Sequence, residues 1–229
     1  MTQKPKPTAE PAAGADKRVR IARRVAAELA DGSLVNLGIG LPTLVANFIP
    51  KDKTVFLQSE NGFIGLGPEA APGTEDWDLV NAGGKPVTMV PGGCYFDSSL
   101  SFAVIRGGHV DVTVLGALEV DEEGNLANYM IPGKMVPGMG GAMDLVVGAK
   151  KVIIAMEHVN KHGAPKILRR CTLPLTARKE VDLIVTDMAV IRVAHDGLIL
   201  EQIAEGTTVE AVVRCTGCQL QIHQKVGEF

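Results

Sequence analysis

Residues 54–68 read Thr-Val-Phe-Leu-Gln-Ser-Glu-Asn-Gly-Phe-Ile-Gly-Leu-Gly-Pro. A β-prone run over 54–57 leads directly into a turn at 59–62. Three glycines then punctuate an apolar loop, which Pro68 closes. Ligand sites in α/β proteins gather where strands end in loops at the carboxyl edge of the sheet. We therefore expect Glu60, inside this turn, to lie at such an edge.

The surroundings of Glu60 leave two interpretations open. It is the only acidic residue between Asp52 and Glu69, and Leu57 and Phe63 near it are apolar. A lone carboxylate in such a place is either a partly desolvated nucleophile or base, or a turn residue that points into water. The local sequence alone does not separate them.

The composition indicates a globular protein with an aliphatic core. Of 229 residues, 46% are hydrophobic but only 4% are aromatic. This length predicts one large domain or two small ones. The 26 glycines, which follow no repeat, predict many tight turns and close backbone approaches.

Charge and hydropathy argue against several classes of partner. The net charge is −3, so no basic field is available to attract nucleic acid. No apolar run approaches the roughly 18 residues of a membrane span. The N-terminus has no apolar signal segment, so we expect a cytoplasmic protein. The four cysteines are Cys94, Cys171, Cys215 and Cys218. The last two form a C-x-x-C, but a zinc site would need a second pair of ligands, so we expect all four to be reduced structural thiols.

The chain is expected to form a disordered arm over 1–16 and one domain over 17–229. The arm is rich in Pro, Ala and Gly. A helix over 17–31 follows, because apolar residues recur at Ile21, Val25 and Leu29 and Gly32 can end it.

The stretch 34–42 predicts a strand, a glycine turn and a short helix over 42–48. Gly38 and Gly40 resemble part of a dinucleotide fingerprint, but the third glycine is missing. The turn does bring backbone close to a helix N-terminus, which favours an anionic group.

Two further glycine turns are candidates for ligand contacts. Residues 81–85 end in Lys85, which is either a surface charge or a ligand contact. Residues 131–143 contain Gly140 and Gly141, whose N–H groups can face a ligand because no Cβ stands in the way.

Strands and helices alternate along most of the chain, which predicts an α/β protein with a mostly parallel open sheet and helices on both faces. Helices are expected over 98–106, 142–150 and 207–214. Strands are expected over 87–90, 112–118, 151–156, 181–186, 189–193 and 198–203, with a hairpin turn at 121–125.

Other catalytic constellations are poorly supported. His158 and His162 are four residues apart, but Gly163 and Pro165 make a helix there doubtful, so we expect no metal site. No G-x-S-x-G or Walker-type motif occurs. Asp97 is better interpreted as a helix cap than as a catalytic group.

Several motifs in order make the chain resemble the β chain of the class I 3-oxoacid coenzyme A transferases, over residues 17–222. The nucleophile motif of this family resembles Ser-Glu-Asn-Gly at 59–62 with its Gly-x-Gly-Pro tail. Further similar stretches are 36–42, 81–85, 105–109, 139–145 and 171–176. The resemblance implies the coenzyme A transferase (NagB/RpiA-like) fold.

The resemblance also implies roles for residues. Glu60 would be the carboxylate that forms a covalent intermediate, and Gly141 the backbone donor near the reacting carbonyl. Asn36 and Lys85 would contact coenzyme A, although the stretch 69–84 is one residue longer here than in the family. The supporting positions would be Gly38 and Gly40 beside the coenzyme and Asn61, Gly62 and Gly140 in the loops.

The activity implied is transfer of coenzyme A from a donor such as succinyl-CoA or acetyl-CoA to a 3-oxoacid such as acetoacetate. It would be ping-pong catalysis through a glutamyl–CoA thioester, without a resident cofactor or metal. An α subunit would complete a heterotetramer of two α and two β chains. Alternatives are a thioesterase that uses the same Glu60, a non-catalytic nucleotide- or phosphosugar-binding domain, and a scaffold subunit.

Overall fold

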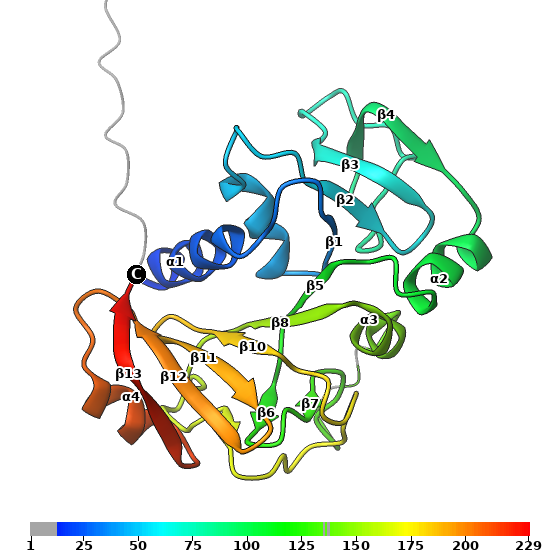
Figure 1. Ribbon diagram of the computed structural model, residues 1–229. Helices are drawn as coiled ribbons and strands as arrows, with labels where there is room; N and C mark the ends of the chain where they lie inside the picture. Colours follow the sequence, from blue (N-terminus) through cyan, green and yellow to red (C-terminus); the bar gives the residue numbers. More distant parts are fainter. Residues whose placement is uncertain (1–12, 135, 137) are drawn as a thin grey trace, which may run out of the picture.

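The computed structural model describes residues 13–134, 136 and 138–229 (Figure 1). The first helix, α1, spans Ala13–Ala27. Residues 13–16, expected in the disordered arm, are therefore its first turn, and the rest of that arm lies outside the described residues. The helix also ends earlier than the expected residue 31, because residues 28–33 form turns, with Gly32 at a φ of +74°.

A ten-stranded sheet forms the centre of the protein, in the order β13-β12-β11-β10-β8-β5-β1-β2-β3-β4. Its strands are β1 Leu34–Leu37, β2 Phe56–Ser59, β3 Phe63–Glu69, β4 Val87–Tyr95, β5 Val112–Leu115, β8 Lys151–Ala155, β10 Leu183–Val185, β11 Ala189–Ala194, β12 Gly197–Ile203 and β13 Leu220–Glu228. A smaller sheet contains β6 Glu119–Asp121, β7 Leu126–Ala127 and β9 Ile167–Leu168.

The five central strands, β10, β8, β5, β1 and β2, are all parallel. Both margins contain antiparallel pairs: β2, β3 and β4 form one meander, and β10, β11 and β12 form another. In Figure 1 these margins lie at opposite ends of the sheet. The prediction of a mostly parallel open sheet is confirmed.

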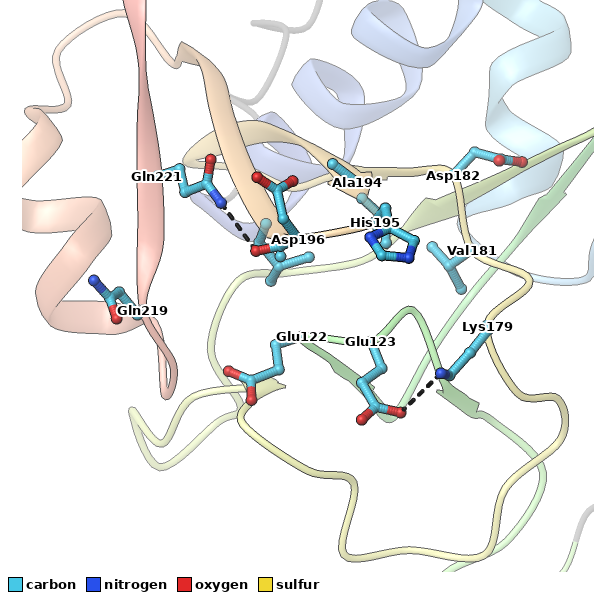
Figure 2. Close-up of a pocket in the computed structure, with 13 residues that line it drawn as sticks. Glu122, Glu123, Lys179, Val181, Asp182, Ala194, His195, Asp196, Gln219 and Gln221 are labelled. Carbon is cyan, nitrogen blue, oxygen red and sulfur yellow. Dashed lines mark hydrogen bonds and ion pairs between the residues drawn. The ribbon is translucent and has the colours of Figure 1, made fainter.

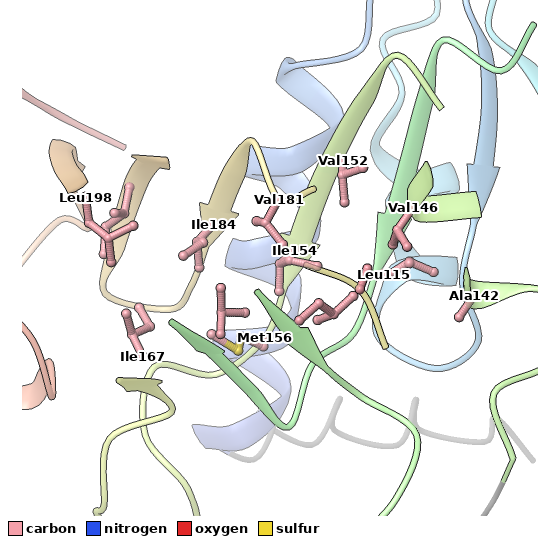
Figure 3. Close-up of a cluster of buried hydrophobic side chains, with 14 of the residues drawn as sticks. Leu115, Ala142, Val146, Val152, Ile154, Met156, Ile167, Val181, Ile184 and Leu198 are labelled. Atoms are coloured by element: carbon pink, nitrogen blue, oxygen red, sulfur yellow. The ribbon is translucent and has the colours of Figure 1, made fainter. Parts of the chain in front are cut away.

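Helices cover both faces of this sheet, as the alternation of apolar residues along the strands requires. On one face lie α1 and the 3₁₀ helix η1, Pro42–Phe48; Ile21, Val25 and Leu29 of α1 are all fully buried there. On the other face lie α2 Ser98–Arg106, α3 Ala142–Gly148 and α4 Val209–Cys215, which contribute to a second apolar cluster. Figure 3 shows part of that cluster. None of the helices in the described part of the chain is both long and apolar enough to cross a membrane.

The expected loop after Gly62 is instead a strand, β3. The prediction of a loop was wrong because it took the glycines as loop residues. In the structure they allow two bulged strands, β3 and β4, to approach closely. A Cβ on Gly65 would lie 2.7 Å from Cα of Gly93 on β4, and one on Gly67 would clash with Thr88. The expected strand 87–90 accordingly extends through Gly93 to Tyr95.

The last strand, β13, is absent from the sequence-based expectations. Its central residues, from Gln221 to Lys225, are exposed, so the sequence shows no alternation of buried apolar positions. The strand lies at the edge of the sheet, and among the described strands it pairs with β12 alone.

Candidate functional site

The strand order places a crevice at β1. The chain continues from β1 to β2 on one side and later adds β5 on the other side, so the direction of winding reverses at β1. Ligands of open α/β sheets bind at such a switch point, outside the carboxyl ends of the strands. Glu60 directly follows β2 at this edge, as expected from the sequence.

The turn that carries Glu60 is anchored on both sides. It joins β2 to β3, with Ser59 paired opposite Phe63. Gly62 closes the turn by donating its N–H to the carbonyl oxygen of Ser59 at 3.0 Å. On the other side, Asn61 Nδ2 donates to the carbonyl oxygen of Val80 at 2.8 Å.

Gly62 is required at its position for two reasons. Its φ of +133° is a conformation that residues with a side chain rarely adopt. A Cβ there would also clash with the carbonyl oxygen of Phe96, while the N–H of Phe96 donates to the Gly62 carbonyl at 2.9 Å. The turn is therefore held directly against the chain that enters α2.

The carboxylate of Glu60 is half-buried and accepts a hydrogen bond from Asn36. Asn36 lies on β1, is fully buried, and brings its Nδ2 within 3.1 Å of Glu60 Oε2. The same nitrogen donates to Gln58 Oε1 at 2.8 Å. The structure thus uses both N–H bonds of the Asn36 amide inside the protein, in contact with the expected nucleophile.

Gly141 lies against the side chain of Glu60. A Cβ on Gly141 would stand 3.4 Å from Glu60 Cγ and 3.3 Å from Phe102 Cζ. Gly141 is the residue before α3, and Gly140 before it has a φ of +50°. The second glycine loop is thus brought to the same place as the Glu60 turn, although about eighty residues separate them.

Gly38 and Gly40 form the loop beside this site. Gly38 donates its N–H to the Val114 carbonyl at 2.8 Å, so it packs closely on the end of β5. Gly40 has a φ of +93° and open space around it. The intervening Ile39 is exposed and meets the 81–85 turn, since a Cβ on Gly83 would lie 3.5 Å from its Cγ1.

Lys85 lies on the surface at the end of that turn. Its backbone N–H donates to Asn81 Oδ1, and its Nζ forms an ion pair with Glu69 Oε1 at 3.0 Å. Both partners are about two-thirds exposed, with 66% and 68% of the side chain accessible. Such a pair contributes about 0–1 kcal/mol, so the ammonium group is free to exchange its partner for an anionic ligand.

Gln58 and Ser101 are two polar residues of the site that the sequence did not indicate. Gln58 is buried on β2 and donates from Nε2 to Ser101 Oγ on α2 at 3.0 Å. One signal in the sequence was the polar residue Gln58 directly after the β-prone run. A buried amide needs hydrogen-bond partners, so its position in a strand indicates polar neighbours. Its partners come from two other elements, which the sequence does not bring together.

The two best-formed cavities of the described chain do not include Glu60. The larger, about 790 Å³, opens at the amino ends of the parallel strands and is lined by Glu122, Glu123, Lys179, His195 and others (Figure 2). The other, about 510 Å³, lies at the carboxyl ends of β5 and β8, with Leu41, Ala117 and Lys166 among its residues.

Other reactive groups offer no competing centre in the described chain. Burial raises the pKa of Cys171 to about 12 and that of Cys218 to about 11, so both remain protonated thiols. Across residues 13–134, 136 and 138–229, no three His, Cys, Asp or Glu side chains are grouped to hold a metal ion.

Residues 18–214 match the family model described as "Coenzyme A transferase". The chain is 58% identical over 207 residues to the β subunit of the acetate CoA-transferase of Escherichia coli K12, covering 90% of this chain and 94% of that one. It is 53% identical over 211 residues to one subunit of a probable succinyl-CoA:3-ketoacid coenzyme A transferase of Bacillus subtilis, covering 92% and 98%.

Some relatives are much longer. The chain spans 40% of a mouse mitochondrial succinyl-CoA:3-ketoacid coenzyme A transferase, at 51% identity over 90% of this chain. Among solved structures, it covers 43% of an acyl-CoA transferase of Escherichia coli O157:H7, with a TM-score of 0.74 over 93% of this chain and 22% identity.

The fold, the strand order that places Glu60 at the carboxyl edge of the sheet and these similarities agree with one another. The chain belongs to the coenzyme A transferase family, as a β subunit of the class I enzymes.

Proposed function

We propose that Glu60 is the nucleophile of a coenzyme A transferase that moves the coenzyme from an acyl-CoA donor to a 3-oxoacid. The observation that carries this proposal is a half-buried carboxylate at the switch point of the sheet, hydrogen-bonded by Asn36 and in contact with Gly141. Family membership supplies the reaction class, since the matching relatives are named as coenzyme A transferases.

The proposed reaction is a group transfer in two covalent stages, and no atom is oxidised or reduced. Glu60 attacks the thioester carbonyl of the donor, the C–S bond breaks, and a mixed anhydride and CoA thiolate form. The thiolate attacks the glutamyl carbonyl and releases the donor acid as a carboxylate, which leaves a glutamyl–CoA thioester. An acceptor carboxylate then repeats both steps in reverse and regenerates Glu60.

The surroundings of Glu60 suit this role. A carboxylate is a weak nucleophile when water solvates it fully, and partial burial replaces some of that water with fixed dipoles. The hydrogen bond from Asn36 engages Oε2 and leaves Oε1 to attack. Gly141 presents its backbone beside the same carboxylate, and one preorganised oxyanion donor is typically worth roughly 3–4 kcal/mol.

The coenzyme would be held away from the reacting bond. We assign the 38–40 loop and Lys85 to this role, with the exposed Ile39 between the two turns as an apolar contact. Binding energy from this remote part of the substrate would hold the thioester in position for attack. Asn36 is assigned to the carboxylate rather than to the coenzyme, because its amide N–H groups are already used.

We further propose that an α subunit closes the site, in a heterotetramer of two α and two β chains. The bacterial relatives are named as single subunits, and in the mouse relatives the stretch similar to this chain is part of a sequence more than twice as long. Neither cavity described above contains Glu60, as expected if a second chain supplies the missing wall. Acetyl-CoA or succinyl-CoA as donor and acetoacetate as acceptor are the substrates to test first.

The test is intact-mass analysis of this chain after the co-expressed subunits are incubated with an acyl-CoA. We expect a CoA adduct on the peptide that contains Glu60, and none with Glu60→Gln. Glu123→Gln, at the amino edge, is the control and should keep the adduct.

An adduct that persists in Glu60→Gln would contradict the proposed nucleophile. Release of free thiol without an acceptor acid would indicate a thioesterase instead. Full turnover by this chain alone would contradict the proposed role of an α subunit.

A further inference from the structure

A row of polar side chains crosses the sheet beneath Glu60, where apolar residues would be expected. Gln58 on β2, Asn36 on β1 and Thr113 on β5 are partners in register, and all three are buried. Ser101 of α2, also fully buried, lies above the row and accepts from Gln58 Nε2 at 3.0 Å. We call Asn36, Gln58 and Ser101 the amide relay.

The amide relay has one consistent direction. A carboxylate can only accept hydrogen bonds, so Asn36 must turn its Nδ2 toward Glu60. Asn36 Nδ2 donates to Gln58 Oε1 at 2.8 Å and to Glu60 Oε2 at 3.1 Å, and it also lies 3.4 Å from the backbone carbonyl oxygen of Gln58. Gln58 therefore turns its own Nε2 away, toward Ser101.

This arrangement leaves polar atoms unsatisfied elsewhere. Asn36 Oδ1 and Thr113 Oγ1 are buried and have no hydrogen-bond partner among the described residues. An unpaired buried oxygen is unfavourable, and such groups are rare in folded proteins. The orientation of the Asn36 amide toward Glu60 therefore leaves its own Oδ1 without a partner among the described residues.

We propose that Gln58 and Ser101 are positioning residues, which hold the Asn36 amide in the orientation that aims the Glu60 carboxylate at the thioester. This inference rests on the proposed nucleophilic role of Glu60. Ser101 acts through Gln58, and Gln58 acts through Asn36; neither contacts Glu60 by a hydrogen bond. Among the ionisable side chains described, only Glu60 forms a hydrogen bond with the relay.

The sharpest test is Gln58→Glu. When the introduced carboxyl is neutral, it has the same donor and acceptor as the amide and preserves the relay. When it ionises, it places a second negative charge across Asn36 from Glu60 and can no longer donate to Ser101. Burial and the nearby carboxylate should shift this ionisation to higher pH than that of a free glutamate.

We expect kcat of Gln58→Glu to approach the wild-type value at the acid end of the profile and to fall at least tenfold as pH rises, with KM little changed. Gln58→Leu, which cannot ionise, should be slow at every pH. A loss in Gln58→Glu that does not vary with pH would overturn the inference, because the expected loss follows the ionisation of the introduced carboxyl. The melting temperature, measured at each pH, separates this effect on kcat from unfolding.

A second test compares Ser101→Ala with Ser33→Ala. Ser33 is also buried, but it precedes β1 at the opposite edge and donates only to the Ala30 carbonyl. We expect Ser101→Ala to slow formation of the Glu60 adduct in a single turnover by about tenfold. Ser33→Ala should change the melting temperature without changing this rate.

The outcomes separate the two proposals. If the wild-type protein forms no adduct on Glu60, the proposed function fails. If the adduct forms at the same rate in wild type, Ser101→Ala and Gln58→Leu, the function stands and the positioning role of the relay is wrong.

Discussion

The amino and carboxyl edges of the central sheet differ in the burial and the partners of their glutamate side chains. At the amino edge, Glu123 and Lys179 pair at 3.8 Å across a large open cavity, and both side chains are mostly exposed (Figure 2). At the carboxyl edge, Glu60 is half-buried and bonded to a neutral amide. The first carboxylate has a cationic partner and lies mostly in water, whereas the second has a neutral hydrogen-bond donor and is only partly exposed.

Under the proposed role of Glu60, cavity volume is a poor guide to the reactive site of a single subunit. The cavity at the amino edge is lined in part by paired or exposed charges, and exposed ion pairs contribute about 0–1 kcal/mol. Strand direction is more informative, because the reversal at β1 leaves an opening only where parallel strands end. A second subunit could convert that opening into a closed site.

The largest expected difference between the edges concerns two glycines of similar conformation. Gly62, in the Glu60 turn, has a φ of +133°, and Gly197, the first residue of β12 after the β11–β12 turn, has a φ of +125°. An added Cβ clashes with the Phe96 carbonyl at Gly62 but meets nothing closer than 3.7 Å at Gly197. We expect Gly62→Ala to lower the free energy of unfolding by on the order of 4 kcal/mol and Gly197→Ala by about 1–3 kcal/mol.

Gly62→Ala should also displace Glu60 and reduce transfer by roughly 100-fold. Gly197→Ala should leave transfer unchanged. Urea denaturation measures the change in stability, and initial rates measure the change in transfer. Equal losses of activity in both variants would show that the conformation of the Glu60 turn has no special importance for transfer.

An intermediate effect is expected from acid. His158 follows β8 at the carboxyl edge, where burial lowers its pKa to about 4 from the ordinary value of 6.5. The unfolded chain therefore binds a proton below pH 6.5 that the folded chain binds only near pH 4. Stability from this group is complete above pH 6.5 and is lost as pH falls toward 4, by on the order of 3 kcal/mol.

Urea midpoints at about pH 7, 6 and 5 measure this loss. His158→Gln should flatten the dependence, whereas His195→Gln, at the exposed amino edge, should retain it. Below about pH 4.5, carboxylates with lowered pKa values, such as Glu28, also become protonated and add to the loss of stability. The measurements therefore stop at about pH 5. An unchanged slope in His158→Gln would assign the acid sensitivity to other groups.

The smallest expected effect concerns two surface lysines. Lys85 pairs with Glu69 beside the site, and Lys150 pairs with Asp111 at the amino edge; their side chains are 66% and 62% exposed. Neither substitution by Ala should change stability by more than about 1 kcal/mol. Lys85→Ala should raise KM for acyl-CoA by up to about tenfold at constant kcat, since it removes only a remote contact.

Lys150→Ala should leave KM at the wild-type value. If the two variants behave alike, the assignment of Lys85 to coenzyme binding is wrong.

Much of the fold could be predicted from local signals. The helix expected over 98–106 has the observed bounds, and Asp97 caps it by accepting from the Leu100 N–H. The turn at Asp196 and Gly197 predicts the β11–β12 hairpin. These elements depend on capping groups and turn residues close in sequence, so short windows contain their physical cause.

Other elements depend on distant partners and could not be predicted locally. β3 resembles a glycine loop in sequence because its glycines serve contacts with β4 that the sequence does not reveal. For the site, the motif at 59–62 leads to Glu60, but Gln58 and Ser101 carry no motif. Their roles follow only from contacts between β2, β1 and α2.

The sequence by itself determined the alternating α/β pattern, the turn that presents Glu60 and the resemblance to a transferase family. These follow from residue types and from spacings of a few positions. Only the tertiary structure decided which face of Asn36 meets Glu60, which buried oxygens stay unpaired, and how Gly141 reaches the same carboxylate. The reason is physical: a hydrogen bond or close contact between separate elements depends on how the sheet is ordered, and that order is set by burial of the whole chain rather than by any one segment.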